Sequence, residues 1–339
     1  MKKQIFLLLL VLLSGRQFLL AQQRPQYTQY ILNNYIINPA LSGIENYTDV
    51  KISNRDQWVG LNGAPQTMYL TIHTPIGKKD YKTSATSFQM PGENPRGKAY
   101  WENYTASEAH HGAGLSIVND KTGLYNRLYA NLSYAYHIGL SPRTNMSAGF
   151  AGGIQKLSRD GSRSTYANND PTDPAQGSTD DVYKIRPDLS AGIWVYSADY
   201  FFGLSGQQII PQKVSFTDDT LGFKIVPHLF VTAGYRFLIT DDINAIPSVM
   251  VKYVSPVDPQ IDANIKLQYR DLFWIGASCR FKDGFAGMLG LNISNTLNVG
   301  YAYDYTTSNL GTISKGTHEI IIGFLLGNRY DDSCPRNIW

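Results

Sequence analysis

Apolar and polar residues alternate with a period of two along many short stretches of this chain, which is the pattern of half-buried β-strands. Residues 261–269 show it most cleanly. Their apolar face holds Ile261, Ala263, Ile265, Leu267 and Tyr269, and their polar face holds Asp262, Asn264, Lys266 and Gln268. No stretch keeps the period of an amphipathic helix, so the pattern predicts an all-β protein.

Fourteen strands are expected in all. The first two, 50–59 and 66–76, are joined by Gly60–Pro65, whose glycines and proline are typical of a hairpin connection. The other twelve are Gly112–Asn119, Tyr125–Ile138, Asn145–Gln155, Pro187–Tyr196, Tyr200–Gly206, His228–Ile239, Asn244–Tyr253, Ile261–Tyr269, Leu272–Phe281, Phe285–Ile293, Leu297–Tyr305 and Thr317–Leu326. An even number of antiparallel strands suits a single-chain bacterial outer-membrane barrel.

The polar strand faces favour a barrel over a soluble β-sandwich, which would alternate as well. A sandwich directs its polar face to water and favours Lys, Glu and Thr there. Here the polar faces hold mainly Gly, Ser, Asn and a few opposite charges, which suits a packed lumen. Tyrosines also fall at strand ends, where a barrel has its aromatic girdles: Tyr136, Tyr253, Tyr269, Tyr303 and Tyr305. The sequence therefore predicts an antiparallel outer-membrane β-barrel of about fourteen strands.

The first residues have the pattern of a secretory signal peptide. Two lysines precede the apolar run Ile5–Leu13, and Ala21 offers a cleavage point. That run is too short to cross a bilayer as a helix, and no other stretch approaches the necessary length. We expect a signal peptide at 1–21, a periplasmic segment at 22–46, the barrel at 47–326 and a tail at 327–339.

The lengths of the connections give the orientation. If the chain enters the first strand from the periplasm, five of the periplasmic connections are short turns. The opposite side carries the long loops 157–186, 207–227 and 306–316. Outer-membrane barrels are expected to have long loops on the outer side and short turns on the periplasmic side.

One connection, 77–111, breaks this rule, because it is long and would lie on the periplasmic side. It is rich in aromatic residues, which are enriched where proteins dock. The candidate docking residues are Tyr81, Phe88, Tyr100, Trp101 and Tyr104. The alternatives are a pair of missed strands, or a loop that folds back to plug the lumen.

Composition and motifs exclude several functions. Charged residues are only 17% and the net charge is +3, which does not suit nucleic-acid binding. Glu108 with His110 and His111 could be half a metal site, but no second ligand cluster has suitable spacing, and the oxygen-rich loop around Asp170 lacks the calcium-loop pattern. No catalytic or phosphate-binding motif is present, so we expect no enzyme, metal or cofactor. Cys279 and Cys334 could pair, but one falls mid-strand and the other in a polar tail.

Charged residues on the polar strand faces form a last candidate group. They are Arg236, Lys252, Asp262, Lys266 and Arg280, joined by Asp304 and Glu319. They lie on successive carboxy-terminal strands, so they can pair across the lumen or set the ion selectivity of a pore. Bulky Trp274, Phe230 and Met250 share the inner face and would narrow a channel, which favours pairing.

Residues 27–76 carry short motifs in a specific order. They are Gln29-Tyr30, Asn38-Pro39-Ala40, Gly43, Arg55-Asp56-Gln57-Trp58-Val59-Gly60, Gly63-Ala64-Pro65-Gln66-Thr67 and His73-Thr74-Pro75. In this order and spacing the set resembles the amino-terminal signature of the PorP/SprF family, outer-membrane proteins of the type IX secretion system of Bacteroidetes. The likeness continues in Asn169–Ala175 and Pro187–Ile193. The resemblance identifies the following residues as candidates for a structural or partner-binding role: Asn38, Pro39, Arg55, Gln57, Trp58, Gly60, Pro65, His73 and Pro75.

The resemblance implies a non-enzymatic outer-membrane component that supports secretion or surface attachment of cargo such as gliding adhesins. It implies outer-membrane lipid, a secreted adhesin or other type IX cargo, and periplasmic secretion or motor components as partners. The residues alone leave two other classes open, a general diffusion channel of the porin kind and an outer-membrane enzyme.

Overall fold

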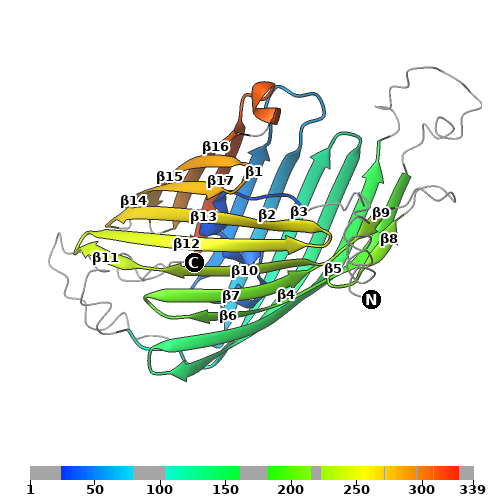
Figure 1. Ribbon diagram of the computed structural model, residues 1–339. Coiled ribbons are helices and arrows are strands. Elements are labelled where there is room, and N and C mark those ends of the chain that lie inside the picture. Colours follow the sequence, from blue (N-terminus) through cyan, green and yellow to red (C-terminus); the bar gives the residue numbers. More distant parts are fainter. Residues whose placement is uncertain are drawn as a thin grey trace, which may run out of the picture.

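The computed structural model describes residues 24–78, 104–160, 182–214, 223–270, 272–294, 296–307 and 309–327. Most of them belong to one antiparallel sheet that closes on itself as a barrel (Figure 1). Its strands are β1 (Thr48–Asp56), β2 (Gln66–Ile76), β3 (His110–Thr122), β4 (Tyr125–Ser141), β5 (Thr144–Arg159), β6 (Val182–Tyr196), β7 (Tyr200–Gln207), β10 (His228–Tyr235), β11 (Phe237–Thr240), β12 (Ile243–Val254), β13 (Val257–Tyr269), β14 (Phe273–Arg280), β15 (Gly284–Ser294), β16 (Leu297–Thr306) and β17 (Thr317–Leu326).

The barrel has fourteen strands, as the sequence predicts. β10 pairs with β7 on one side and β12 on the other, which closes the ring, and β1 pairs with β17. β10 and β11 both pair with β12 and are separated only by Arg236, so they form one interrupted strand. The antiparallel fourteen-stranded barrel is therefore confirmed.

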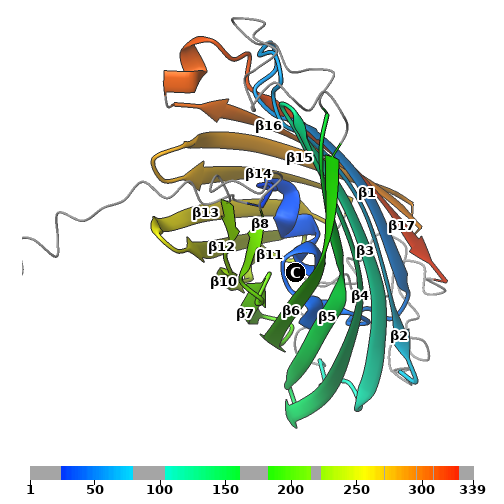
Figure 2. The same ribbon diagram turned by 90° about the vertical axis from the view of Figure 1, so that its right-hand side faces the viewer.

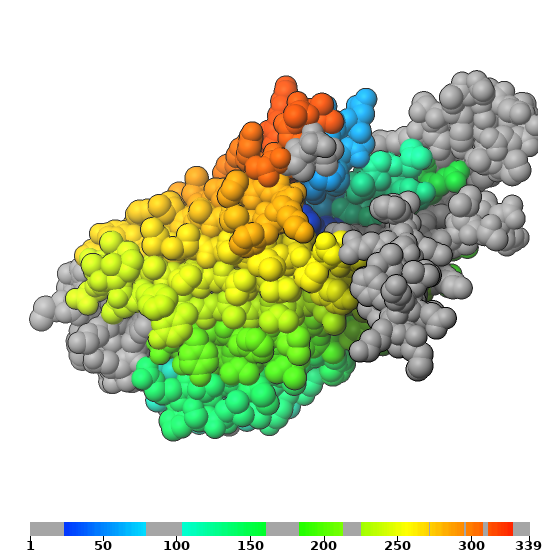
Figure 3. Space-filling model, in the orientation of Figure 1, coloured from blue at the N-terminus to red at the C-terminus, as the bar shows by residue number. Residues whose placement is uncertain are grey.

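Side chains alternate between the outside and the lumen along each strand, because successive residues of a strand point to opposite faces. On β13 the outward Ile265 is 46% exposed, whereas the inward Asp262 is 1% exposed. The outer wall over β12, β13 and their neighbours is continuous in the space-filling view (Figure 3). Exposed apolar side chains and tyrosines cover this wall, as lipid contact requires.

The two ends of the barrel differ. Short turns join β4 to β5, β6 to β7, β11 to β12 and β13 to β14 at one end, which lies at the left for the yellow strands of Figure 1. We call it the turn end, and the opposite one the loop end. The loop end carries a small extra hairpin, β8 (Gln212–Val214) with β9 (Phe223–Ile225), which the sequence pattern misses because three residues are too few to show a period.

The segment before β1 lies inside the barrel. It contains three short 3-10 helices, η1 (Gln29–Leu32), η2 (Asn34–Ile36) and η3 (Pro39–Leu41), and a fourth, η5 (Asn309–Thr312), lies between β16 and β17. Figure 2 shows the blue segment surrounded by the strands. The sequence predicts a periplasmic location for residues 22–46, and the structure corrects this for residues 24–46. Short 3-10 turns carry no strand or helix period, so the pattern could not reveal a buried segment here.

Other expectations fall partly outside the described residues. The signal peptide, the docking residues Tyr81, Phe88, Tyr100 and Trp101, and Cys334 lie there. Cys279 is a free thiol in β14. Among the residues described, no helix is both long and apolar enough to cross a bilayer.

Candidate functional site: the occupied lumen

The lumen is filled by residues 24–47, which we call the plug. Its aromatic and aliphatic side chains pack against inward residues from strands all around the barrel. The shared hydrophobic cluster contains Tyr27, Tyr30, Ile31, Ile36 and Ile37 of the plug, and Tyr69, Val118, Tyr129, Phe230, Met250, Trp274, Met288, Ala302 and Ile321 of the wall. This cluster thus joins the plug to the wall across the lumen.

The plug begins at the loop end, where four strands hold Arg24. Its backbone N–H donates to His228 Nε2 at 3.0 Å, and its guanidinium donates to Gln207 Oε1 at 2.7 Å. The guanidinium also lies over the Tyr129 ring and 3.9 Å from Asp188. His228 Nδ1 lies 3.0 Å from the Val226 carbonyl oxygen, so Nδ1 is the donor and Nε2 the acceptor. The amino-terminal end of the plug is therefore anchored at the loop end.

A buried ionic network holds the next part of the plug. Arg55 of β1 donates to Thr28 Oγ1 at 2.9 Å, to Glu319 at 2.8 Å and to Asp304 at 2.7 Å. Glu319 accepts the backbone N–H of Thr28 at 2.8 Å, and the Gln29 amide donates to the Glu319 carbonyl oxygen at 2.7 Å. Charge-assisted bonds of this kind are stronger than neutral ones. Arg55 thus offsets two buried carboxylates that bind the plug backbone and Thr28.

The Asn38-Pro39-Ala40 motif begins η3, the last 3-10 helix of the plug. Asn38 Oδ1 accepts the Ala40 N–H at 3.0 Å, so it caps η3, and Pro39 takes the first helical position, where no N–H is needed. The Asn38 amide donates to the carbonyl oxygens of Ile193 and Leu204, on β6 and β7. The motif therefore shapes the turn and ties it to the wall.

Three histidines hold the Ser42-Gly43 turn near the turn end. His137 Nε2 lies 2.8 Å from the Ser42 carbonyl oxygen, and His110 Nε2 lies 3.2 Å from that of Gly43. His73 Nδ1 accepts the Gly43 N–H at 3.4 Å. The His110 and His137 rings stack, with centroids 4.4 Å apart. These side chains bind backbone, and His110 is part of a clamp rather than of the half metal site considered from the sequence.

The close approach of the plug to β3 requires glycine. Gly43 has φ +72°, a conformation that other residues rarely adopt. A Cβ at Gly112 would lie 1.8 Å from the Ser42 carbonyl oxygen.

His111, the neighbour of Gly112, points to the outer wall, where its Nδ1 lies 2.6 Å from the Tyr134 hydroxyl. No group of three metal-ligating side chains occurs within the described ranges.

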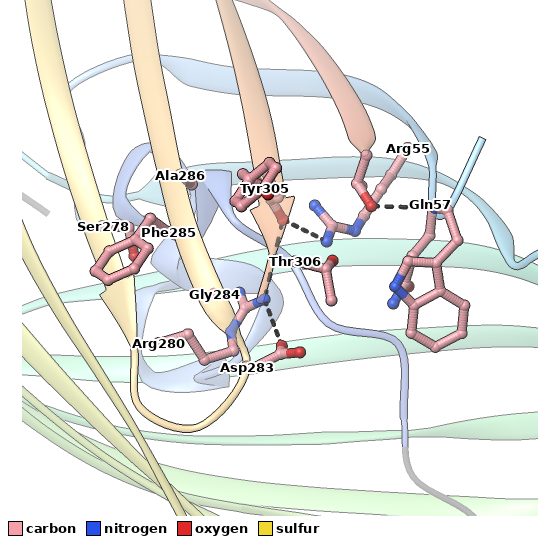
Figure 4. Close-up of a pocket in the computed structure, with 13 residues that line it drawn as sticks. Arg55, Gln57, Ser278, Arg280, Asp283, Gly284, Phe285, Ala286, Tyr305 and Thr306 are labelled. Carbon is pink, nitrogen blue, oxygen red and sulfur yellow. Dashed lines mark hydrogen bonds and ion pairs between the residues drawn. The ribbon is translucent and has the colours of Figure 1, made fainter. Parts of the chain in front are cut away.

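The remaining signature residues build the β1–β2 connection at the loop end. The backbone N–H of Trp58 donates to Thr317 Oγ1, and the backbone N–H of Gln57 donates to the Pro65 carbonyl oxygen. Trp58 and Gly60 have positive φ. Arg55, Gln57 and Trp58 line one pocket, opposite Arg280 and Asp283 (Figure 4). Pro75 lies in β2, opposite Gly112 of β3.

The five predicted lumen charges are all buried, but they do not form one cluster. Arg280 pairs with Asp262 at 3.3 Å and lies 3.9 Å from Asp304, so it extends the Arg55 network. Lys252 faces the same loop-end region on β12. Lys266 lies nearer the turn end, with its ammonium 6.0 Å from the centre of the Trp274 ring. Arg236 lies at the break between β10 and β11, where its N–H donates to the Asp199 carbonyl oxygen.

A cavity of about 70 Å³ lies beside the plug, lined by Leu32, Asp49, Lys51, Lys266 and Trp274 among others. Of the docking candidates, Tyr104 is described, and its hydroxyl accepts from the Asn145 amide at 3.2 Å. The sequence reasoning missed Arg24, Thr28 and His137, since their role depends on a partner far away in the sequence or on a segment without periodicity.

Comparison with curated proteins finds no match. Comparisons with solved structures and with family models do find similar proteins. The CymD monoaromatic hydrocarbon channel is 10% identical with a TM-score of 0.47, over 88% of this chain and 93% of that one. The Ralstonia pickettii toluene transporter TbuX is 11% identical with a TM-score of 0.43, over 87% and 92%. A family model described as type IX secretion system membrane protein PorP/SprF matches residues 19–324.

Proposed function

Because this outer-membrane chain belongs to the PorP/SprF family of type IX secretion system membrane proteins, we propose that it acts as a closed scaffold for secretion or surface attachment of cargo such as gliding adhesins. In this role the barrel is a fixed point in the outer membrane, and it contacts its partners through surfaces at its two ends. Cargo binds at the loop end, and periplasmic secretion or motor components bind at the turn end.

The occupied lumen is the observation that carries this proposal. A diffusion channel needs a continuous water-filled path, and here the hydrophobic cluster around Tyr27, Tyr30 and Ile31 crosses that path. The plug is held by side chains from β1, β3, β4, β7, β10 and β17, so removing it would break contacts on every side. A barrel built in this way is better suited to holding partners than to passing solutes.

The buried polar groups also argue against an enzyme. Arg55, Asp304 and Glu319 bind one another and the plug, and His73, His110 and His137 bind backbone atoms. The hydrogen bonds of these titratable side chains thus go to one another and to the plug.

The test is to inactivate the gene in the native cell and to restore it with the wild-type chain. Secreted and surface-attached proteins are then compared by mass spectrometry, and partners are captured by cross-linking before solubilisation. We expect loss of one or a few cargo proteins from the surface, recovered on restoration. An unchanged surface proteome and secretome would overturn the proposal.

A further inference from the structure

The outward side chains of β3–β6 form rows across the barrel wall, because the strand register aligns them. The central rows are apolar; two of them are Leu115-Leu132-Gly152-Leu189 and Ile117-Ala130-Ile154-Pro187. The two rows nearest the loop end differ, since each contains a lysine. They are Asn119-Leu128-Lys156-Ile185 and Lys121-Asn126-Ser158-Tyr183.

The position of these lysines along the strands puts them at the border of the bilayer. The row of His111 and Tyr136 carries girdle aromatics at the turn end, and Lys121 is ten residues further along β3. At about 3.4 Å per residue and a tilt of about 40°, this is a height of about 26 Å. The apolar band of such barrels is about 25 Å tall. Lys121 therefore lies at headgroup level on the loop-end side, and Lys156, one row nearer the turn end, can extend its long side chain to the same level.

Near this level, beside the β3–β4 turn at Gly123 and Leu124, lies a groove of about 270 Å³. Its lining includes Lys121, Lys156, Arg159, Asn126, Tyr125 and Tyr183, with Asp160 as the one acidic residue. The Lys156 ammonium lies 4.8 Å from the centre of the Tyr183 ring, which orients it along the wall. The groove thus combines positive charge with amide and hydroxyl donors.

We propose that this groove binds the phosphorylated headgroup of an outer-leaflet lipid. The phosphate oxygens accept hydrogen bonds from the ammonium groups of Lys121 and Lys156 and from the Asn126 amide. The acyl chains lie against the outward Ile154, one row nearer the turn end than Lys156, and against Ile185, which stands beside Lys156 in the same row. An acidic segment of a protein partner would meet the same lysines but would gain nothing from the apolar rows, so the lipid is favoured. Basic pockets beside membrane-spanning segments bind anionic headgroups through the same forces.

The test uses the purified full-length barrel and four probes: phosphorylated lipid A, its dephosphorylated form, inorganic phosphate and an acidic peptide. Binding is measured by native mass spectrometry and by retention of lipid phosphorus on the immobilised protein. The double variant Lys121→Gln/Lys156→Gln removes the proposed contacts. Lys282→Gln is the control, because it removes one lysine charge from the loop end between β14 and β15, where the side chain is 87% exposed.

We expect the double variant to lose about thirtyfold in affinity for phosphorylated lipid A, since each lysine near an anionic surface contributes about fivefold. Lys282→Gln should bind like wild type, and Lys121→Arg should retain most of the affinity because it keeps the charge. Heat-modifiable gel migration checks that every variant is folded. Equal binding by the double variant, equal binding of dephosphorylated lipid, or full competition by inorganic phosphate or by an acidic peptide at the concentration of the lipid would each overturn the proposal.

Discussion

Replacing Arg55 by methionine tests whether the ionic network fixes the plug. Arg55 is 2% exposed and binds Thr28, Asp304 and Glu319 at 2.7–2.9 Å. Its loss leaves the two carboxylates buried with fewer partners. Breaking a buried ion pair by removing one member costs about 3–5 kcal/mol. Glu319 keeps the Thr28 N–H and Asp304 keeps Arg280 nearby, so we expect a loss of about 3 kcal/mol.

The free energy of unfolding is measured by urea titration of the purified barrel in detergent, followed by tryptophan fluorescence. Neutralising the partners as well, in Arg55→Met/Asp304→Asn/Glu319→Gln, should bring stability back to within about 1–2 kcal/mol of wild type, because no charge is then left unpaired. The control is Arg270→Met. Arg270 makes two bonds to Asp242, at 2.9 and 3.0 Å, and these bonds raise the pKa of Arg270, but both side chains are solvent-accessible. A loss in Arg55→Met no larger than that in Arg270→Met, or no recovery in the triple variant, would refute the reasoning.

Three further predictions concern the plug, the wall and the long connection. Gly112→Ala puts a Cβ against the Ser42 carbonyl oxygen and should lower stability by about 1–3 kcal/mol and make the plug sensitive to protease, whereas Gly287→Ala, with open space around it, should change neither. Ile265→Arg on the lipid face should cost about 2–4 kcal/mol in a urea titration, with a milder effect for Lys266→Gln; equal effects would contradict the assigned faces. Deleting residues 79–103 should leave the heat-modifiable barrel intact and abolish co-purification of a periplasmic partner; retention of every partner and of full cargo secretion would count against docking there.

The barrel could be predicted from the sequence because strand alternation is local. Ile261–Tyr269 shows its two faces without any knowledge of its neighbours, and the same is true of enough strands to reach fourteen. The hairpin connection could also be predicted, because glycine is the residue that adopts positive φ in turns. Gly60 and Gly63 both have positive φ in the structure. Buried inward charges such as Asp262 and Arg280 followed from the same alternation.

The plug could not be predicted, because its evidence is not local. Asn38-Pro39 marks a turn in the sequence, but nothing there shows that Asn38 reaches the carbonyl oxygens of Ile193 and Leu204. The pairing of Arg24 with Gln207 joins residues 183 positions apart. The sequence indicated His110 as half of a possible metal site. Its partner is instead the backbone carbonyl of Gly43, and a contact to backbone cannot be recognised from residue types.

Conductance of the purified full-length barrel in a planar lipid bilayer tests the closed-scaffold account most directly. A general diffusion porin in the same membrane shows that insertion and recording work, and heat-modifiable migration shows that the barrel is folded. With the plug across the lumen, the account predicts insertion without stepwise open-channel currents. Regular, stable current steps of the size that the porin gives would contradict it.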